Sequence, residues 1–149
     1  MITITRRLEF DAGHRIPDHA SKCRSLHGHR YTLEVTLQGT PVEAPGRPEH
    51  GMLADFADVR RIAEELVVAA WDHAFLVYRE DRALVEFLTG LPGQKTAVLD
   101  RVPTVENLVA IAFERLAPEY ERRYGGSLRL ERARLQETPN CWAECQART

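Results

Sequence analysis

Two long segments near the start of the chain alternate between apolar and polar residues with a period of two. In the first, residues 2–14, the apolar side chains share one face, which only Arg6 interrupts. In the second, residues 27–38, large apolar residues alternate with threonine, glutamate and glutamine. Successive side chains of a β-strand point to opposite sides of the sheet, so both segments are predicted to be strands buried on one face.

Helical periodicity predicts the elements that cover this buried face. Apolar residues recur at helical spacing over residues 56–70, directly after Asp55, which suits the N-cap position. A second long helix is predicted to open at Pro103 and to run to about Ala117. The other expected elements are a short helix over 82–88, loops over 15–26 and 39–51, a turn at 125–126, and strands over 127–137 and 142–146.

This order of elements predicts an α+β fold, in which an antiparallel sheet carries helices on one face. In the strand predicted over 127–137, the apolar phase slips between Leu130 and Ala133, which indicates a β-bulge. The length of 149 residues suits one compact domain, so a single domain over residues 1–149 is expected.

Charge and hydropathy exclude several classes of protein. A formal net charge of −2 and an isoelectric point near 6.3 argue against a surface for nucleic acid or anionic membranes. No apolar run approaches the roughly 18 residues that span a bilayer, and the first residues lack the order of a signal peptide. We therefore expect a cytoplasmic protein without nucleic-acid or membrane partners.

Three cysteines are too few for a disulfide framework. Cys141 and Cys145 would lie roughly 13 Å apart on one strand, at about 3.3 Å per residue, so a single ion would hardly reach both. We interpret these two residues as small hydrophobic side chains.

His27, Gly28 and His29 form the clearest chemical feature of the chain. Two residues apart on a strand, both imidazoles point to the same side, and the glycine adds no side chain to the other. If the first two strands pair antiparallel, His14 lies beside this pair and shares its phase. Three neutral imidazoles without a carboxylate predict a zinc site that keeps one open position.

Cys23 precedes this histidine pair in the same loop, and three interpretations remain open for it. Near a divalent cation its thiol would have a lowered pKa and could act as a base or nucleophile. It could instead be a fourth zinc ligand in a closed structural site, or an inert buried residue.

Three further residues are candidates, each with an alternative structural interpretation. Asp72 and His73 end the predicted long helix, and they could hydrogen-bond to one another only if the helix stops there. Glu137 ends a strand, where its carboxylate could accept two N–H groups from the edge of a guanine-like or pterin ring, or simply face solvent.

Taken together, the motifs resemble those of the 6-pyruvoyl-tetrahydropterin synthase and 6-carboxytetrahydropterin synthase family. The resemblance covers nearly the whole chain. It rests on Phe10-Asp-Ala-Gly-His14, Cys23-Arg-Ser-Leu-His27-Gly-His29, Gly51-Met-Leu-Ala-Asp55-Phe56, Trp71-Asp72-His73-Ala-Phe-Leu76, Pro103-Thr-Val-Glu-Asn107 and Glu137-Thr-Pro-Asn-Cys-Trp-Ala143.

The resemblance implies a T-fold, with a four-stranded antiparallel sheet and two main helices packed on one face. It also implies a homohexamer of two stacked trimers, with active sites between subunits. Three groups of site residues follow from it: the Zn²⁺ ligands His14, His27 and His29; the catalytic residues Cys23, Asp72, His73 and Glu137; and Glu137 as the residue that binds the pterin ring.

The spacing between Cys23 and His27 is similar to that of the bacterial 6-carboxytetrahydropterin synthases of queuosine biosynthesis. This implies a lyase that converts 7,8-dihydroneopterin triphosphate to 6-carboxy-5,6,7,8-tetrahydropterin, releasing acetaldehyde and triphosphate. The alternatives are a pyruvoyl-forming synthase acting on the same substrate and a non-catalytic zinc-binding domain. The stretch from Arg79 to Val102 departs from the family in being longer than in its compact members.

Overall fold

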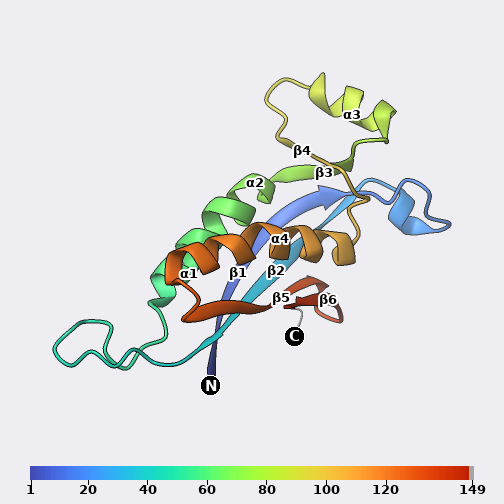
Figure 1. The fold of residues 1–149 in the computed structure, drawn as a ribbon. Coiled ribbons are helices and arrows are strands. Elements are labelled where there is room, and N and C mark those ends of the chain that lie inside the picture. The colour runs from blue at the N-terminus through green and yellow to red at the C-terminus, as the bar shows by residue number, and fades with distance from the viewer. Residues whose placement is uncertain (148–149) are drawn as a thin grey trace.

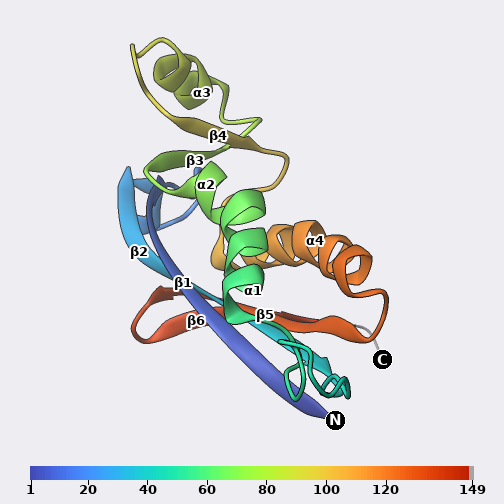
Figure 2. The same cartoon turned by 90° about the vertical axis from the view of Figure 1, so that its left-hand side faces the viewer.

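A computed structural model describes residues 1–147 as a curled sheet with helices packed against it (Figures 1 and 2). The expected domain over 1–149 therefore includes two residues, 148–149, that lie outside the described part. The strands are β1 Ile2–His14, β2 His27–Gly39, β3 Ala74–Tyr78, β4 Thr96–Leu99, β5 Leu128–Thr138 and β6 Cys141–Gln146. The helices are η1 Lys22–Arg24, α1 Phe56–Ala63, η2 Glu64–Val68, α2 Ala69–Trp71, α3 Arg82–Thr89 and α4 Val105–Tyr124.

The two strands predicted first, β1 and β2, form the centre of the sheet. They pair antiparallel over their whole length, from Ile2 opposite Gly39 to His14 opposite His27, as the sequence predicts. Their apolar rows face the helices, and the side chains of Leu33 and Leu37 are fully buried. Because this register is continuous, His14, His27 and His29 lie together at one end of the β1–β2 pair.

The strand β5 contains the bulge that its phase slip predicts. Thr36 of β2 lies opposite Arg132, but the next residue, Leu37, lies opposite Leu130. Glu131 is therefore the extra residue. The bulge lets apolar residues on both sides of it face the core, which explains why the sequence pattern changes phase there.

The expectation of a four-stranded, wholly antiparallel sheet is wrong. The sheet has six strands in the order β4-β3-β1-β2-β5-β6, and β3 runs parallel to both β1 and β4. On β3, Leu76 packs into the main core, whereas its neighbour Val77 packs with Leu84 and Leu88 of α3. Because β3 is apolar on both faces, it lacks the alternation that identifies the other strands.

The two main helical segments lie on one face of the sheet, as the resemblance implies (Figure 2). The first, α1 to α2, runs almost without interruption and contains the π-helical turn η2. The short α3 packs against Val77, on the opposite face at the β3–β4 edge. None of the helices in residues 1–147 is both long and apolar enough to cross a membrane.

Both long helices begin where the sequence predicts, but α4 ends later than expected. The side chain of Asp55 accepts a hydrogen bond from Ala57 N–H at 2.7 Å, and Thr104 caps α4 in the same manner. The helix continues beyond Ala117 and through Pro118 to Tyr124. Tyr120 is fully buried and donates a hydrogen bond to the Val59 carbonyl at 2.8 Å, and this packing offsets the cost of an interior proline.

Candidate metal centre and a separate aspartate–histidine cluster

The register of β1 and β2 brings three imidazoles together at one end of the sheet. His14 lies opposite His27, and His29 is one pleat further along on the same face. One nitrogen of each ring lies within 4.8 Å of the corresponding nitrogen of the other two. The structure therefore places the three predicted ligands in a single cluster, the histidine triad.

The hydrogen bonds of the triad leave its inward-facing nitrogens free to bind a cation. His14 Nδ1 lies 2.8 Å from the Pro103 carbonyl and His27 Nδ1 lies 2.7 Å from the Ser25 carbonyl. A carbonyl only accepts, so each Nδ1 carries the proton and each Nε2 has a lone pair. The two Nε2 atoms are 3.1 Å apart, and the buried His29 Nε2 has no hydrogen-bond partner. Lone pairs this close favour a shared cation.

Burial keeps the rings of His14 and His29 in the neutral form that binds metals. Desolvation is the largest effect on His14 and His29, and it lowers the pKa of both below the ordinary histidine value. The hydrogen bond to the Pro103 carbonyl at His14, and the attraction of Glu137 at both rings, oppose this shift but do not reverse it. A neutral imidazole is the ligand form of histidine, so the environment suits a divalent ion.

Glu137 lies at the edge of the triad on β5. Its Oε1 is 3.5 Å from His14 Nε2 and 3.8 Å from His29 Nε2, and the side chain is 21% exposed. Tyr31 is buried beside the rings, and desolvation together with Glu137 raises the pKa of its hydroxyl. The carboxylate thus borders the histidine triad and remains accessible from outside.

Gly28 allows β1 and β2 to approach closely between the two triad residues His27 and His29. A Cβ added at Gly28 would lie 2.9 Å from the Ala12 carbonyl oxygen, a backbone atom that cannot move without its strand. We expect Gly28→Ala to lower the free energy of unfolding by about 1–3 kcal/mol and to weaken the binding of a metal ion by the triad. Urea unfolding and metal titration measure the two effects, and wild-type values of both would contradict this role of Gly28.

Cys23 lies on η1 in the loop before β2, and its thiol is free and partly buried. Its carbonyl accepts a hydrogen bond from Ile16 N–H at 2.8 Å, which closes the loop. Among the described residues, the cluster of potential ligand atoms contains the three histidines and not Cys23. This arrangement does not support Cys23 as a fourth metal ligand.

Asp72 and His73 form a second cluster with Asp11 of β1. The helix stops at Trp71, and His73 adopts a left-handed conformation with φ of 58°, so the adjacent side chains meet. His73 Nδ1 lies 3.0 Å from Asp72 Oδ1, which also accepts a hydrogen bond from Asp11 N–H at 3.0 Å. Burial alone would raise the pKa of Asp72, but these two hydrogen bonds hold it below the usual range.

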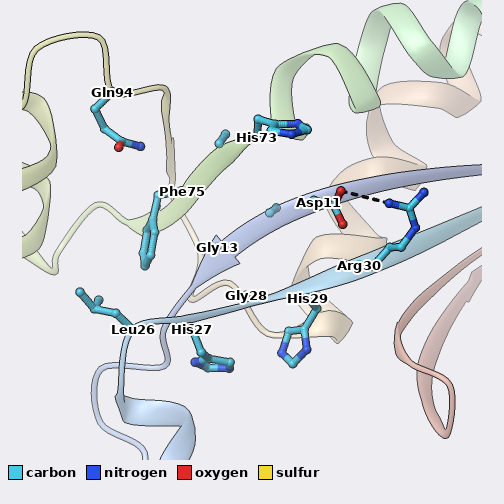
Figure 3. Close-up of a pocket in the computed structure, with 12 residues that line it drawn as sticks. Asp11, Gly13, Leu26, His27, Gly28, His29, Arg30, His73, Phe75 and Gln94 are labelled. Atoms are coloured by element: carbon cyan, nitrogen blue, oxygen red, sulfur yellow. Dashed lines mark hydrogen bonds and ion pairs between the residues drawn. The ribbon is translucent and has the colours of Figure 1, made fainter.

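The two clusters lie on opposite faces of the sheet. Ala74 packs in the core, so Phe75, the next residue of β3, points to the outer face, which also carries Asp11, and His73 lines a hollow together with these two residues. Figure 3 shows His73 on the far side of the strands from the rings of His27 and His29. The structure therefore does not bring Asp72 and His73 to the histidine triad of the same chain.

The outer face beside His73 is hollowed. The opening measures about 690 Å³ and is lined in part by Gly13, Gly28, Phe75 and Gln94, and also by His27 and His29 of the histidine triad (Figure 3). The two glycines are direct partners in the β1–β2 ladder, so no side chain fills the space above them. His73, whose side chain is 77% exposed, borders this hollow.

Two residues with roles at the second cluster are not predicted by the sequence reasoning. Asp11 holds the Asp72–His73 turn through its backbone, and its only signal is its place in the motif that ends at His14. Lys95 contacts the same turn from the long segment between β3 and α4, where no pattern in the sequence indicates it.

Comparisons with known proteins agree with this geometry. The model of the family described as PTPS, 6-pyruvoyl tetrahydropterin synthase, matches residues 3–148. Two proteins called 6-carboxy-5,6,7,8-tetrahydropterin synthase are similar to this chain: that of Rickettsia bellii is 37% identical over 145 residues and that of Rickettsia felis 33% over 144. Each alignment covers 97% of this chain and 99% of the relative.

A solved structure has the same fold. The 6-pyruvoyl tetrahydropterin synthase of Caenorhabditis elegans matches with a TM-score of 0.65 at 25% identity, over 99% of this chain and 96% of that one. The similarity spans both the histidine triad and the aspartate–histidine cluster.

Proposed function

The chain belongs to the 6-pyruvoyl tetrahydropterin synthase family, and we propose that it acts as a zinc-dependent 6-carboxytetrahydropterin synthase. The substrates are 7,8-dihydroneopterin triphosphate and one water molecule, and the products are 6-carboxy-5,6,7,8-tetrahydropterin, acetaldehyde and triphosphate. The observation that carries this proposal is the convergence of His14, His27 and His29 in a chain similar over its full length to enzymes of that name.

The donor set favours zinc as the metal. Three neutral imidazoles fit Zn²⁺, and a site with three protein ligands leaves a position for substrate. The carbonyls of Pro103 and Ser25 orient the first two rings, which is the usual support of a metal-binding histidine. When bound, zinc would polarise a side-chain hydroxyl of the substrate and stabilise negative charge on its oxygen.

Glu137 is suited to anchor the pterin ring beside the metal. Its carboxylate can accept two N–H groups from the edge of the ring, a geometry that fixes both position and orientation. Because Oε1 lies 3.5 Å from His14 Nε2, a ring held there presents its side chain to the metal centre. Positioning of this kind contributes much of the rate enhancement of an enzyme.

We assign the proton transfers to Cys23 and His73. The reaction removes protons from side-chain carbons next to the hydroxyls, and a thiol and an imidazole are both side chains that serve as general acids and bases. Asp72 accepts a hydrogen bond from the His73 ring and so fixes its orientation.

Since His73 faces away from the triad of its own chain, we propose that it serves the zinc of a neighbouring copy. The hollow beside His73 would receive that copy. In a homohexamer with shared sites, the aspartate–histidine cluster of one chain would then lie beside the histidine triad of another. Such an arrangement requires at least two chains for one complete site.

The products formed from dihydroneopterin triphosphate test the proposed reaction. We expect mass spectrometry to detect a carboxylated tetrahydropterin together with acetaldehyde. A pyruvoyl-tetrahydropterin without acetaldehyde would instead assign the second activity that occurs in this family, which the C. elegans enzyme is named for. Absence of any turnover by the zinc-loaded protein would favour a non-catalytic zinc-binding domain.

A further inference from the structure

The long segment between β3 and α4 contains a lysine, Lys95, whose side chain reaches the Asp72–His73 turn. Lys95 directly precedes β4, and its Nζ donates hydrogen bonds to the carbonyls of Ala69 and Asp72, both at 2.7 Å. These are carbonyls at the end of α2, where a helix leaves its last carbonyls without partners and where a cation is favoured. The Lys95 ammonium therefore caps the C-terminal end of α2, and His73 lies just beyond that end.

Lys95 and Asp11 hold the two ends of one peptide group. The peptide between Asp72 and His73 has its carbonyl bound by Lys95 Nζ, and its N–H donates to the Asp11 carbonyl at 2.7 Å. With both polar atoms held, this peptide plane cannot rotate freely. The φ of 58° at His73, a conformation that costs a non-glycine residue free energy, is thereby maintained.

The main chain of Lys95 is itself fixed. Its carbonyl accepts a hydrogen bond from Phe75 N–H at 3.0 Å, so β3 and β4 are joined beside the turn. This contact ties the start of β4 to the residue two positions after His73. The parallel β3–β4 pair, together with α3 packed on it, is thus the support that brings Lys95 to the helix end.

We propose that Lys95 is a positioning residue for His73, holding the Asp72–His73 peptide so that the imidazole keeps the orientation in which it transfers protons. This inference rests on the proposed function, in which His73 is part of the proton relay. It also gives the long segment between Arg79 and Val102 a role, because this segment contains Lys95 and places it where it supports His73.

Kinetics of Lys95→Met test this role, with Lys95→Arg and Arg79→Met for comparison. Arg79 lies in the same segment, but its guanidinium pairs with Asp100 at 2.7 Å. We expect Lys95→Met to lower kcat about tenfold with KM within about twofold and unchanged zinc content. Lys95→Arg should restore most of the rate, and Arg79→Met should match the wild type. A kcat within about twofold of wild type in Lys95→Met would overturn the proposal.

Hydrogen exchange gives a second readout that does not depend on turnover. The amide of His73, which bonds to Asp11, should exchange about tenfold faster in Lys95→Met than in wild type or Arg79→Met, while core amides such as that of Leu33 stay protected. Unchanged protection of the His73 amide would overturn the proposal that Lys95 holds the Asp72–His73 peptide in place. If wild-type protein converts no pterin substrate, the proposed function fails, and the exchange data still decide whether Lys95 fixes the turn.

Discussion

Replacing His29 with alanine is expected to remove most of the bound zinc and to lower kcat/KM by about 10³-fold or more. In the proposed site His29 supplies one of three ligands to a catalytic zinc ion, and the two remaining imidazoles would bind Zn²⁺ much more weakly than three. This position is the most informative of the three because its ring is only partly buried. His14 is fully buried and bonded to Pro103, so its loss would also disturb the fold.

The matched control for His29→Ala is His19→Ala. His19 is an exposed loop residue outside the triad, and its ring accepts a hydrogen bond from Ser21 N–H. Metal analysis and kinetics of both variants should show zinc loss and inactivity only for His29→Ala. If His29→Ala kept a full equivalent of zinc with normal activity, the triad would not be the catalytic metal centre.

Replacing Cys23 with alanine is expected to lower kcat by about 10³-fold while leaving zinc content and KM near their wild-type values. General acid–base groups typically contribute 10²- to 10⁴-fold, and Cys23 lies outside the cluster of metal ligands. Cys141→Ala serves as the control, because Cys141 is an exposed thiol on β6. Loss of zinc together with activity in Cys23→Ala would instead identify Cys23 as a ligand.

Mixing the Cys23→Ala protein with a His73→Ala protein extends this test to the shared site. Each variant alone lacks one member of the relay. If the relay joins two chains, subunit exchange creates some sites with both residues intact, and activity should return to a substantial fraction of wild type. No recovery after verified exchange would mean that the two residues do not act across subunits.

The histidine triad could be predicted because every step to it depends on local patterns. Alternation fixes which face each strand buries, and the first two strands are consecutive in the chain, joined by the loop over residues 15–26, which favours antiparallel pairing. His14 is then in phase with His27 and His29 and adjacent to them. The observed pairing of His14 with His27 follows from the same reasoning.

The second cluster could be predicted only in part, since it depends on contacts between distant segments. That the helix ends at Asp72 and His73 is visible in the sequence, but the left-handed turn and the outward direction of His73 follow from the pairing of β3 with β1. The β3 strand is short and apolar on both faces, so periodicity does not reveal it. Without β3 and β4, nothing in the sequence places Lys95 near His73.

The coordination of zinc tests the central claim most directly. X-ray absorption at the zinc edge of the purified protein should show three imidazole nitrogens and one further oxygen or nitrogen atom, at about 2.0–2.1 Å. This result is expected if His14, His27 and His29 hold the ion and one position stays open to substrate. A sulfur scatterer at about 2.3 Å would contradict the account, because a closed site with Cys23 bound to zinc leaves neither a vacant position nor a free thiol.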